Sequence, residues 1–228
     1  MPHRIRAITL DLDDTLWPVD PVIERAEKRL HAWCEEHAPG VAEALPPAQF
    51  ALYRRALATE LPAIAHDYTA LRLEALRRAL AQYGGDPRLA PSALDVFLAA
   101  RNEIELFPDA LEALRRLTGR YRVVALSNGN ADVARIGIGE YFAAVVNARS
   151  VGCSKPDARI FHAACACLDL RPEEVLHVGD DPDLDVRGAA AAGKRSAWIN
   201  RDGRRWAGEP VDMVEFRDLL ALCDWLRV

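Results

Sequence analysis

Short apolar runs that end in polar or glycine residues recur along this chain. Their length and their abrupt ends predict buried strands. They cover residues 5–10, 121–126, 143–147, 175–178 and 196–199. Helical patterns at residues 109–117, at 156–168 and before Gly193 separate the later runs. This alternation predicts a parallel sheet with right-handed crossovers.

The segment between the first two runs has a helical pattern throughout. Apolar residues recur at three- and four-residue steps over residues 22–37, and further helical stretches continue to residue 104. Roughly 85 consecutive residues therefore contain no strand pattern. We predict an α/β fold in which a Rossmann-like parallel-sheet core of residues 1–16 and 107–228 carries an inserted α-helical domain at residues 17–106.

The composition excludes several classes of protein. Half of the 228 residues are apolar, which rules out collagen and a wholly disordered chain. With 29 Lys and Arg against 34 Asp and Glu, the formal net charge is −5. This balance argues against nucleic acid or an anionic membrane as the main partner. An anionic substrate would need a local source of positive charge.

The cysteines and the N-terminus indicate a compartment. Five cysteines at irregular spacing favour free thiols in a reducing compartment, and Cys165-x-Cys167 has no second pair that would complete a zinc site. The apolar run at residues 7–10 is too short for a secretory signal, and no stretch approaches the ~20 apolar residues that a membrane span needs. We expect a cytoplasmic protein.

Polar residues gather where the predicted strands end. Asp11 and Asp13 follow the first run, Ser127 and Asn128 follow the second, and Asp180 follows the run at residues 175–178. Ligands of an open parallel sheet bind at the carboxyl ends of its strands. Lys155, placed just before a predicted helix, and Asp185 complete the set.

This set of residues suits phosphoryl transfer. Asp11, Asp13, Asp180 and Asp185 would bring several negative charges together, which a divalent cation offsets. Oxygen ligands without His or Cys favour Mg²⁺. Lys155 supplies a positive charge, and the Ser127 hydroxyl can hold phosphate oxygens.

In order along the chain, the segments at residues 8–16, 126–129, 155–157 and 179–185 resemble the four motifs of the haloacid dehalogenase superfamily. The resemblance implies that Asp11 is a nucleophile and Asp13 a general acid and base. It implies that Asp11, the Asp13 carbonyl and Asp180 bind Mg²⁺, with Asp185 in support. It further implies that Ser127 and Lys155 bind the phosphoryl group, and that the insert is a cap. We add Asn128 to the substrate- and phosphate-binding residues, as one that orients the loop or the substrate.

A closer resemblance is to the bacterial branch that dephosphorylates FMN and related riboflavin-pathway phosphates, carried by residues 9–17, 66–69, 127–131 and 176–181. We therefore predict a Mg²⁺-dependent phosphatase of a small phosphorylated metabolite. A phosphomutase, a 2-haloacid dehalogenase and a non-catalytic binding module are the alternatives. A dehalogenase has no evident use for Asp13, because a leaving halide needs no proton. Further candidates for substrate contact are Trp17, His66, Asp67, Arg72 and the aromatic residues Trp33, Phe50, Tyr53 and Tyr68.

Overall fold

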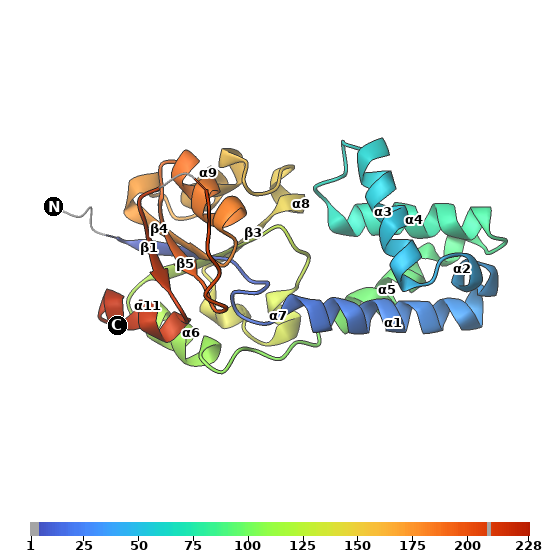
Figure 1. The fold of residues 1–228 in the computed structure, drawn as a ribbon, viewed down its shortest axis with the longest axis horizontal. Helices are drawn as coiled ribbons and strands as arrows, with labels where there is room; N and C mark the ends of the chain where they lie inside the picture. Colours follow the sequence, from blue (N-terminus) through green and yellow to red (C-terminus); the bar gives the residue numbers. More distant parts are fainter. Residues whose placement is uncertain (1–4, 209–210) are drawn as a thin grey trace. The chain divides into compact units, whose positions relative to one another are not determined.

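The computed structural model describes residues 5–208 and 211–228. Contacts divide the chain into two compact units, Met1–Pro18 with Glu105–Val228 and Val19–Ile104. The first contains the sheet and the second is helical (Figure 1). The predicted catalytic, metal-binding and phosphate-binding residues all belong to the first unit.

A six-stranded sheet forms the centre of the first unit, and all its neighbouring strands pair in parallel. This confirms the predicted α/β fold. The order is β3-β2-β1-β4-β5-β6. The strands are β1 (Ala7–Leu10), β2 (Arg122–Ser127), β3 (Ala144–Asn147), β4 (Val175–Gly179), β5 (Arg195–Ile199) and β6 (Met213–Phe216). The sheet therefore grows in opposite directions from β1 and β4, and a crevice at such a switch point is where open α/β sheets bind ligands.

Helices cover both faces of the sheet (Figure 1). On one side are α6 (Ala110–Thr118) and α11 (Leu219–Leu226), and on the other is α9 (Ala158–Ala166). Ile160 and Phe161 of α9 are fully buried in a cluster with residues of the central strands. The remaining segments of this unit are short: α7 (Val133–Ile136), η2 (Gly139–Tyr141), α8 (Ala148–Val151), η3 (Pro172–Glu174), the π-helical η4 (Pro182–Arg187) and α10 (Gly188–Ala191).

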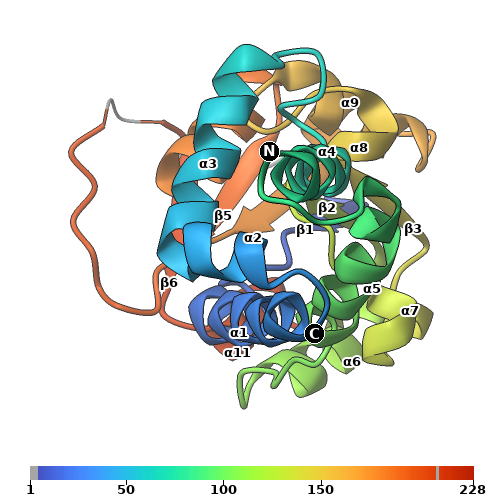
Figure 2. The ribbon, with the colours of Figure 1, turned by 90° about the vertical axis from the view of Figure 1, so that its right-hand side faces the viewer.

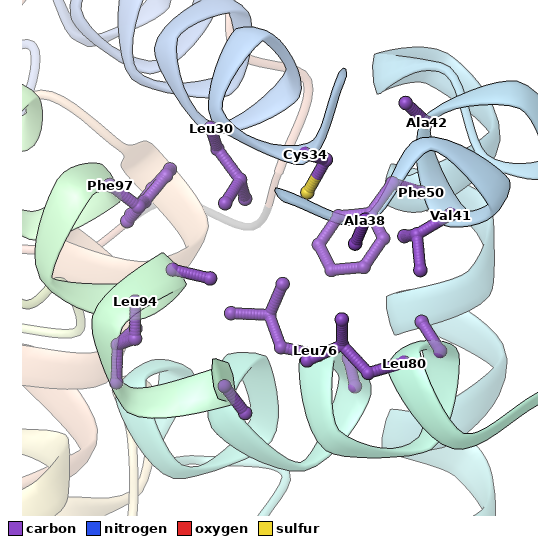
Figure 3. Packing of buried hydrophobic residues seen from close by; sticks show 14 of the residues in the cluster. Leu30, Cys34, Ala38, Val41, Ala42, Phe50, Leu76, Leu80, Leu94 and Phe97 are labelled. Atoms are coloured by element: carbon purple, nitrogen blue, oxygen red, sulfur yellow. The ribbon is translucent and has the colours of Figure 1, made fainter. Parts of the chain in front are cut away.

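The second unit is a bundle of α1 (Val19–His37), α2 (Pro39–Ala44), α3 (Pro47–Glu60), α4 (Tyr68–Gln82), η1 (Pro87–Leu89) and α5 (Ala90–Arg101). In Figure 2, α1 and α4 are seen end-on. Leu30 and Cys34 of α1, Leu76 of α4 and Phe97 of α5 point into one shared apolar core (Figure 3). Within the described ranges, none of the helices is long and apolar enough to cross a membrane.

Several polar residues of the helical unit have structural partners. Arg72 is buried, donates two hydrogen bonds to Glu27 at 3.1 and 2.8 Å and stacks on Phe97. Arg54 donates to the same carboxylate. The Asp67 side chain caps α4 by accepting from two backbone N–H groups. Trp33, Phe50 and Tyr53 belong to or pack on the apolar core, whereas Tyr68 is exposed.

Candidate active site

The carboxyl ends of three adjacent strands bring the predicted residues together. Asp11 follows β1, Ser127 ends β2 and Asp180 follows β4, and these strands are neighbours in the sheet. The Asp11 backbone N–H donates to the Val178 carbonyl at 2.9 Å, which extends the β1–β4 pairing up to the first carboxylate. The switch point of the sheet therefore carries the acidic residues.

Asp11, Asp180 and Asp185 form a group of carboxylates whose oxygens lie within 4.8 Å of one another. No other group of three or more potential metal-ligating side chains is found in residues 5–208 and 211–228. Three carboxylates at this distance repel one another unless protons or cations intervene. Their all-oxygen chemistry fits a hard divalent cation such as Mg²⁺.

Lys155 supplies one positive charge to this group. Its Nζ lies 2.5 Å from Asp11 Oδ1 and 2.6 Å from Asp185 Oδ1, and all three side chains are buried. Burial opposes the charge on Lys155, but the two carboxylates outweigh it and hold the pKa of this lysine above its usual range. Lys155 is thus a fixed cation between Asp11 and Asp185.

Hydrogen bonds to both of its oxygens hold the Asp185 carboxylate in place. Besides Lys155, its Oδ1 lies 3.0 Å from His177 Nε2, and its Oδ2 accepts from the Asp181 N–H at 3.0 Å. Gly179 makes room for it, because a Cβ on Gly179 would lie 2.3 Å from Asp185 Oδ2. The preceding Asp181 caps the segment that carries Asp185 by accepting from two backbone N–H groups. The position of Asp185 is therefore set by packing and hydrogen bonds together.

The charges of the site are unevenly distributed. Burial raises the pKa of Asp11 well above its usual range, and the Asp185 and Asp180 carboxylates add to the rise while Lys155 opposes it. Burial and the Asp185 carboxylate raise the pKa of Asp180 to about 7. For Asp185, Lys155 and the His177 hydrogen bond overcome the effect of burial and hold the pKa below its usual range. Ionising all three carboxylates together therefore requires more positive charge than Lys155 provides.

Asp13 is oriented by a tight turn after β1. The Trp17 indole Nε1–H donates to Asp13 Oδ1 at 2.9 Å, and Trp17 is fully buried. Between them, Asp14 adopts a left-handed backbone conformation with φ 56°, and its N–H donates to the Trp17 carbonyl. Trp17, a candidate for substrate contact in the sequence, helps to orient the Asp13 carboxylate through this hydrogen bond. The Asp13 side chain does not belong to the group of three clustered carboxylates.

Ser127 and Asn128 differ in what their side chains do. Ser127 Oγ accepts from the Gly129 N–H at 2.9 Å, which leaves its hydroxyl hydrogen for another acceptor. Asn128 forms two hydrogen bonds with the backbone of Lys155, accepting at 2.7 Å and donating at 3.1 Å. Asn128 thereby ties the loop after β2 to the loop that carries Lys155.

Four residues at the site were not predicted. The Thr15 hydroxyl donates to Asp180 Oδ1 at 3.3 Å, and Arg204 lies 3.6 Å from Asp180 Oδ2. Thr9 and His177 lie beneath the carboxylates and hydrogen-bond each other. A polar residue inside an otherwise apolar strand was the signal for Thr9 and His177. Arg204 lies after β5, where no sequence pattern marks it. The segment between β5 and β6 is drawn as a long loop in Figure 2.

Comparison with known proteins gives a consistent family. Residues 5–193 match the family described as haloacid dehalogenase-like hydrolase. The chain is 32% identical to the 5-amino-6-(5-phospho-D-ribitylamino)uracil phosphatase YigB of Escherichia coli, over 96% of this chain and 95% of that protein. It is 33% identical to a phosphoserine phosphatase of Thermus thermophilus, over 86% of this chain and 89% of that protein.

Among solved structures, a protein named 2-haloacid dehalogenase from Pseudomonas syringae is similar over the whole chain. Its TM-score is 0.92 at 35% identity, with 98% of each chain covered. The two curated relatives are named as phosphatases and this structure as a dehalogenase. The choice between these reactions therefore depends on the residues of the site.

Proposed function

Because the chain belongs to the haloacid dehalogenase-like hydrolase family, we propose that it is a Mg²⁺-dependent phosphatase of small phosphomonoesters that works through a phosphoryl group on Asp11. The observation that carries the proposal is the buried Lys155 between Asp11 and Asp185, with the Asp180 carboxylate beside them. This combination offers a nucleophile, a fixed cation and the ligands for a second, divalent one.

The carboxylate group fits Mg²⁺. Asp11, Asp180 and Asp185 lie close together, and the buried Lys155 pairs with Asp11 and Asp185. The raised pKa values of Asp11 and Asp180 support the proposal that a further cation binds there. In the proposal, Asp11, the Asp13 carbonyl and Asp180 hold the ion, and Asp185 supports it. The ion would neutralise charge on the transferring phosphoryl group.

Asp11 is the proposed nucleophile. One of its carboxylate oxygens attacks phosphorus, the bond from phosphorus to the ester oxygen breaks, and the electron pair leaves with that oxygen. Lys155, 2.5 Å from Asp11 Oδ1, keeps this carboxylate oriented and offers positive charge to the phosphoryl oxygens. The Ser127 hydroxyl is the further proposed donor to that group, and Asn128 acts on it through the Lys155 loop.

Asp13 is the proposed acid and base. It gives a proton to the leaving alkoxide in the first step. In the second step it takes a proton from water as the water oxygen attacks phosphorus and the bond to Asp11 breaks. The Trp17 indole donates to Asp13 Oδ1 and so helps to orient the carboxyl for this proton transfer.

The name of one relative supports a narrower substrate class. Escherichia coli YigB is named for a ribityl phosphate of the riboflavin pathway, and it is similar over nearly the whole chain. We propose FMN or a related riboflavin-pathway phosphate as the substrate and the cytoplasm as the location, the latter in keeping with five free cysteines. His66, half-buried in the helical unit, remains a candidate for substrate contact.

A second candidate is 2-haloacid dehalogenase, favoured by the name of the similar Pseudomonas syringae structure. The geometry argues against it. A halide leaves without a proton, so that reaction needs neither a positioned Asp13 nor a carboxylate group suited to a cation.

The test is a release assay on the purified chain. FMN, a ribityl phosphate, a panel of sugar phosphates and 2-chloropropionate are each incubated with Mg²⁺ or with EDTA, and both phosphate and chloride are measured. The proposal predicts phosphate release that needs Mg²⁺ and no chloride release. Chloride release without phosphate release would establish the dehalogenase instead.

A further inference from the structure

A row of buried polar side chains crosses the sheet beneath the carboxylates. Thr9 of β1 lies in register with His177 of β4, and His177 lies in register with Ser196 of β5. Neighbours in register point to the same face of a sheet. Here that face is the one covered by α9, because the Phe161 ring meets the His177 ring edge-on at 5.0 Å. Polar groups in such a position cost free energy unless they are hydrogen-bonded.

Lys194 directly precedes β5 and contacts this row of polar side chains through Thr9. Only 4% of it is exposed, and its Nζ donates to Thr9 Oγ1 at 3.2 Å. It also lies 5.6 Å from the centre of the Phe161 ring. No ion pair of Lys194 with a carboxylate is found in the described part of the chain. Charge pairing therefore does not explain why this lysine is buried.

The donor-only character of Lys194 gives the row a direction. Thr9 Oγ1 has two partners within the described residues, Lys194 Nζ at 3.2 Å and His177 Nδ1 at 2.9 Å. The ammonium can only donate, so Thr9 Oγ1 accepts from Lys194, and of its two partners only His177 Nδ1 is able to accept the Thr9 hydroxyl hydrogen. The Asp185 carboxylate, which can only accept, favours the same direction. His177 then carries its hydrogen on Nε2 and donates it to Asp185 Oδ1 at 3.0 Å.

We propose that Lys194, Thr9 and His177 act as a positioning relay that fixes the tautomer of His177 and, through it, the Asp185 carboxylate that holds Lys155. The proposal rests on the proposed function, since it assigns these three residues to the support of Asp185 and Lys155. None of the three touches the reacting atoms. If His177 Nε2 carried no hydrogen, its lone pair would face the Asp185 carboxylate and repel it. The tautomer with its hydrogen on Nδ1 would therefore push Asp185 away from Lys155.

The consequence for the site is orientation. Asp185 Oδ1 receives hydrogen bonds from His177 and from Lys155, and this shared oxygen sets how far Lys155 reaches toward Asp11. Replacing a residue that hydrogen-bonds to a functional side chain typically changes activity by roughly 10- to 100-fold. The relay is therefore expected to affect turnover more than folding.

The first test needs no variant and no substrate. The ¹⁵N chemical shifts of the His177 ring in the intact wild-type chain at neutral pH report which nitrogen carries the hydrogen, with H177Q identifying the resonances. The relay predicts a neutral ring with the hydrogen on Nε2. A hydrogen on Nδ1, or an even mixture of tautomers, would overturn it whether or not the chain is a phosphatase.

The second test separates the relay from mere packing. T9V keeps the shape of Thr9 but removes its hydroxyl, whereas T9S keeps the hydroxyl. Ser196 offers the matched control, because its buried hydroxyl has no hydrogen-bond partner in the described residues and lies next to His177. With a substrate that the wild type hydrolyses, T9V should lower kcat roughly tenfold with KM little changed, while T9S and S196A keep wild-type kcat.

The outcomes are distinct. Equal kcat for T9V and wild type, or an equal loss in T9V and S196A, would contradict the relay while leaving the phosphatase intact. Absence of phosphate release from the wild type itself would instead contradict the proposed function, and the tautomer measurement would still decide the relay. If T9V fails to fold, K194M gives the same comparison, with a shift of the His177 ¹⁵N resonances as the expected result.

Discussion

The Lys155 ammonium lies 2.5 Å from an Asp11 carboxylate oxygen, and both side chains are buried. They come from segments 144 residues apart in the chain. Asp185, 2.6 Å from the same nitrogen, completes an arrangement of two carboxylates on one lysine. Removing either the lysine or the carboxylates from such an arrangement leaves the remaining charge buried and unpaired.

Replacing Lys155 by methionine should therefore cost both stability and activity. K155M leaves Asp11 and Asp185 without their shared cation, and we expect a loss of about 3–5 kcal/mol in the free energy of unfolding. The double variant K155M/D185N removes one of the two carboxylates and should recover much of that stability, but no phosphate release. Urea unfolding in EDTA measures the first effect. Equal stability of K155M and wild type would show that the pair is not energetically coupled.

The two aspartates of the first loop should fail in different ways. D11N removes the proposed nucleophile and should abolish phosphate release from every substrate. D13N removes the proton donor, so its loss should be large for an alkyl phosphate and much smaller for p-nitrophenyl phosphate, whose leaving group needs little protonation. Steady-state rates on both substrates provide the measurement. An equal loss on the two would refute the role of Asp13 as the acid.

Asp180 should make the free energy of unfolding depend on pH in the absence of metal, and Mg²⁺ should remove this dependence. Burial raises its pKa to about 7 in the folded chain without metal, against an ordinary value near 3.8. The folded state then holds the proton more tightly than the unfolded state, so this contribution to stability is complete below about pH 4 and lost as pH rises through about 7.

The test compares D180N with wild type in EDTA. D180N lacks the titration, so its free energy of unfolding relative to wild type should rise by roughly 2–3 kcal/mol between pH 5 and pH 8. Adding Mg²⁺ at pH 8 should stabilise wild type and leave D180N nearly unchanged. A pH-independent difference between the two proteins would contradict the raised pKa.

The helical unit offers a prediction that is independent of catalysis. Glu27 pairs with Arg54 and with the buried Arg72. E27Q leaves these arginines without a carboxylate and should lower the free energy of unfolding by about 3–5 kcal/mol. Glu24 is the matched control: it lies on the same helix, is exposed and, among the described residues, forms its ion pair with Lys28, so E24Q should leave the free energy of unfolding essentially unchanged. Thermal unfolding of both variants makes the comparison.

The pattern of the chain predicted the centre of the fold better than its edges. β1 and β4 are buried along their whole length, so their apolar runs were unambiguous. β6 at the edge of the sheet is only partly buried and contains Glu215, and no strand was predicted there. The short α2 begins at Pro39, a favoured first helical residue, but its six residues are too few to show a helical period in the sequence.

The carboxylates could be predicted because strand ends mark them, whereas their support could not. Thr9 and His177 are single polar residues in buried strands, and what they bind depends on the register between strands distant in sequence. Lys194 looks like an ordinary residue after a helix-ending glycine, although only 4% of it is exposed. Contacts across strands are decided by the folded sheet, so local pattern alone did not assign these residues to the site.

The phosphoryl group on Asp11 is the centre of this account, and trapping it is the most direct measurement. The wild-type chain is mixed with excess substrate and Mg²⁺, and the reaction is quenched in acid within one turnover. The protein is then digested, and the masses of its peptides are measured by mass spectrometry. We predict a peptide heavier by one phosphoryl group, with the group on Asp11, and its absence in D11N. Phosphate release by the wild type with no such adduct on Asp11, or with the adduct on another residue, would contradict the account.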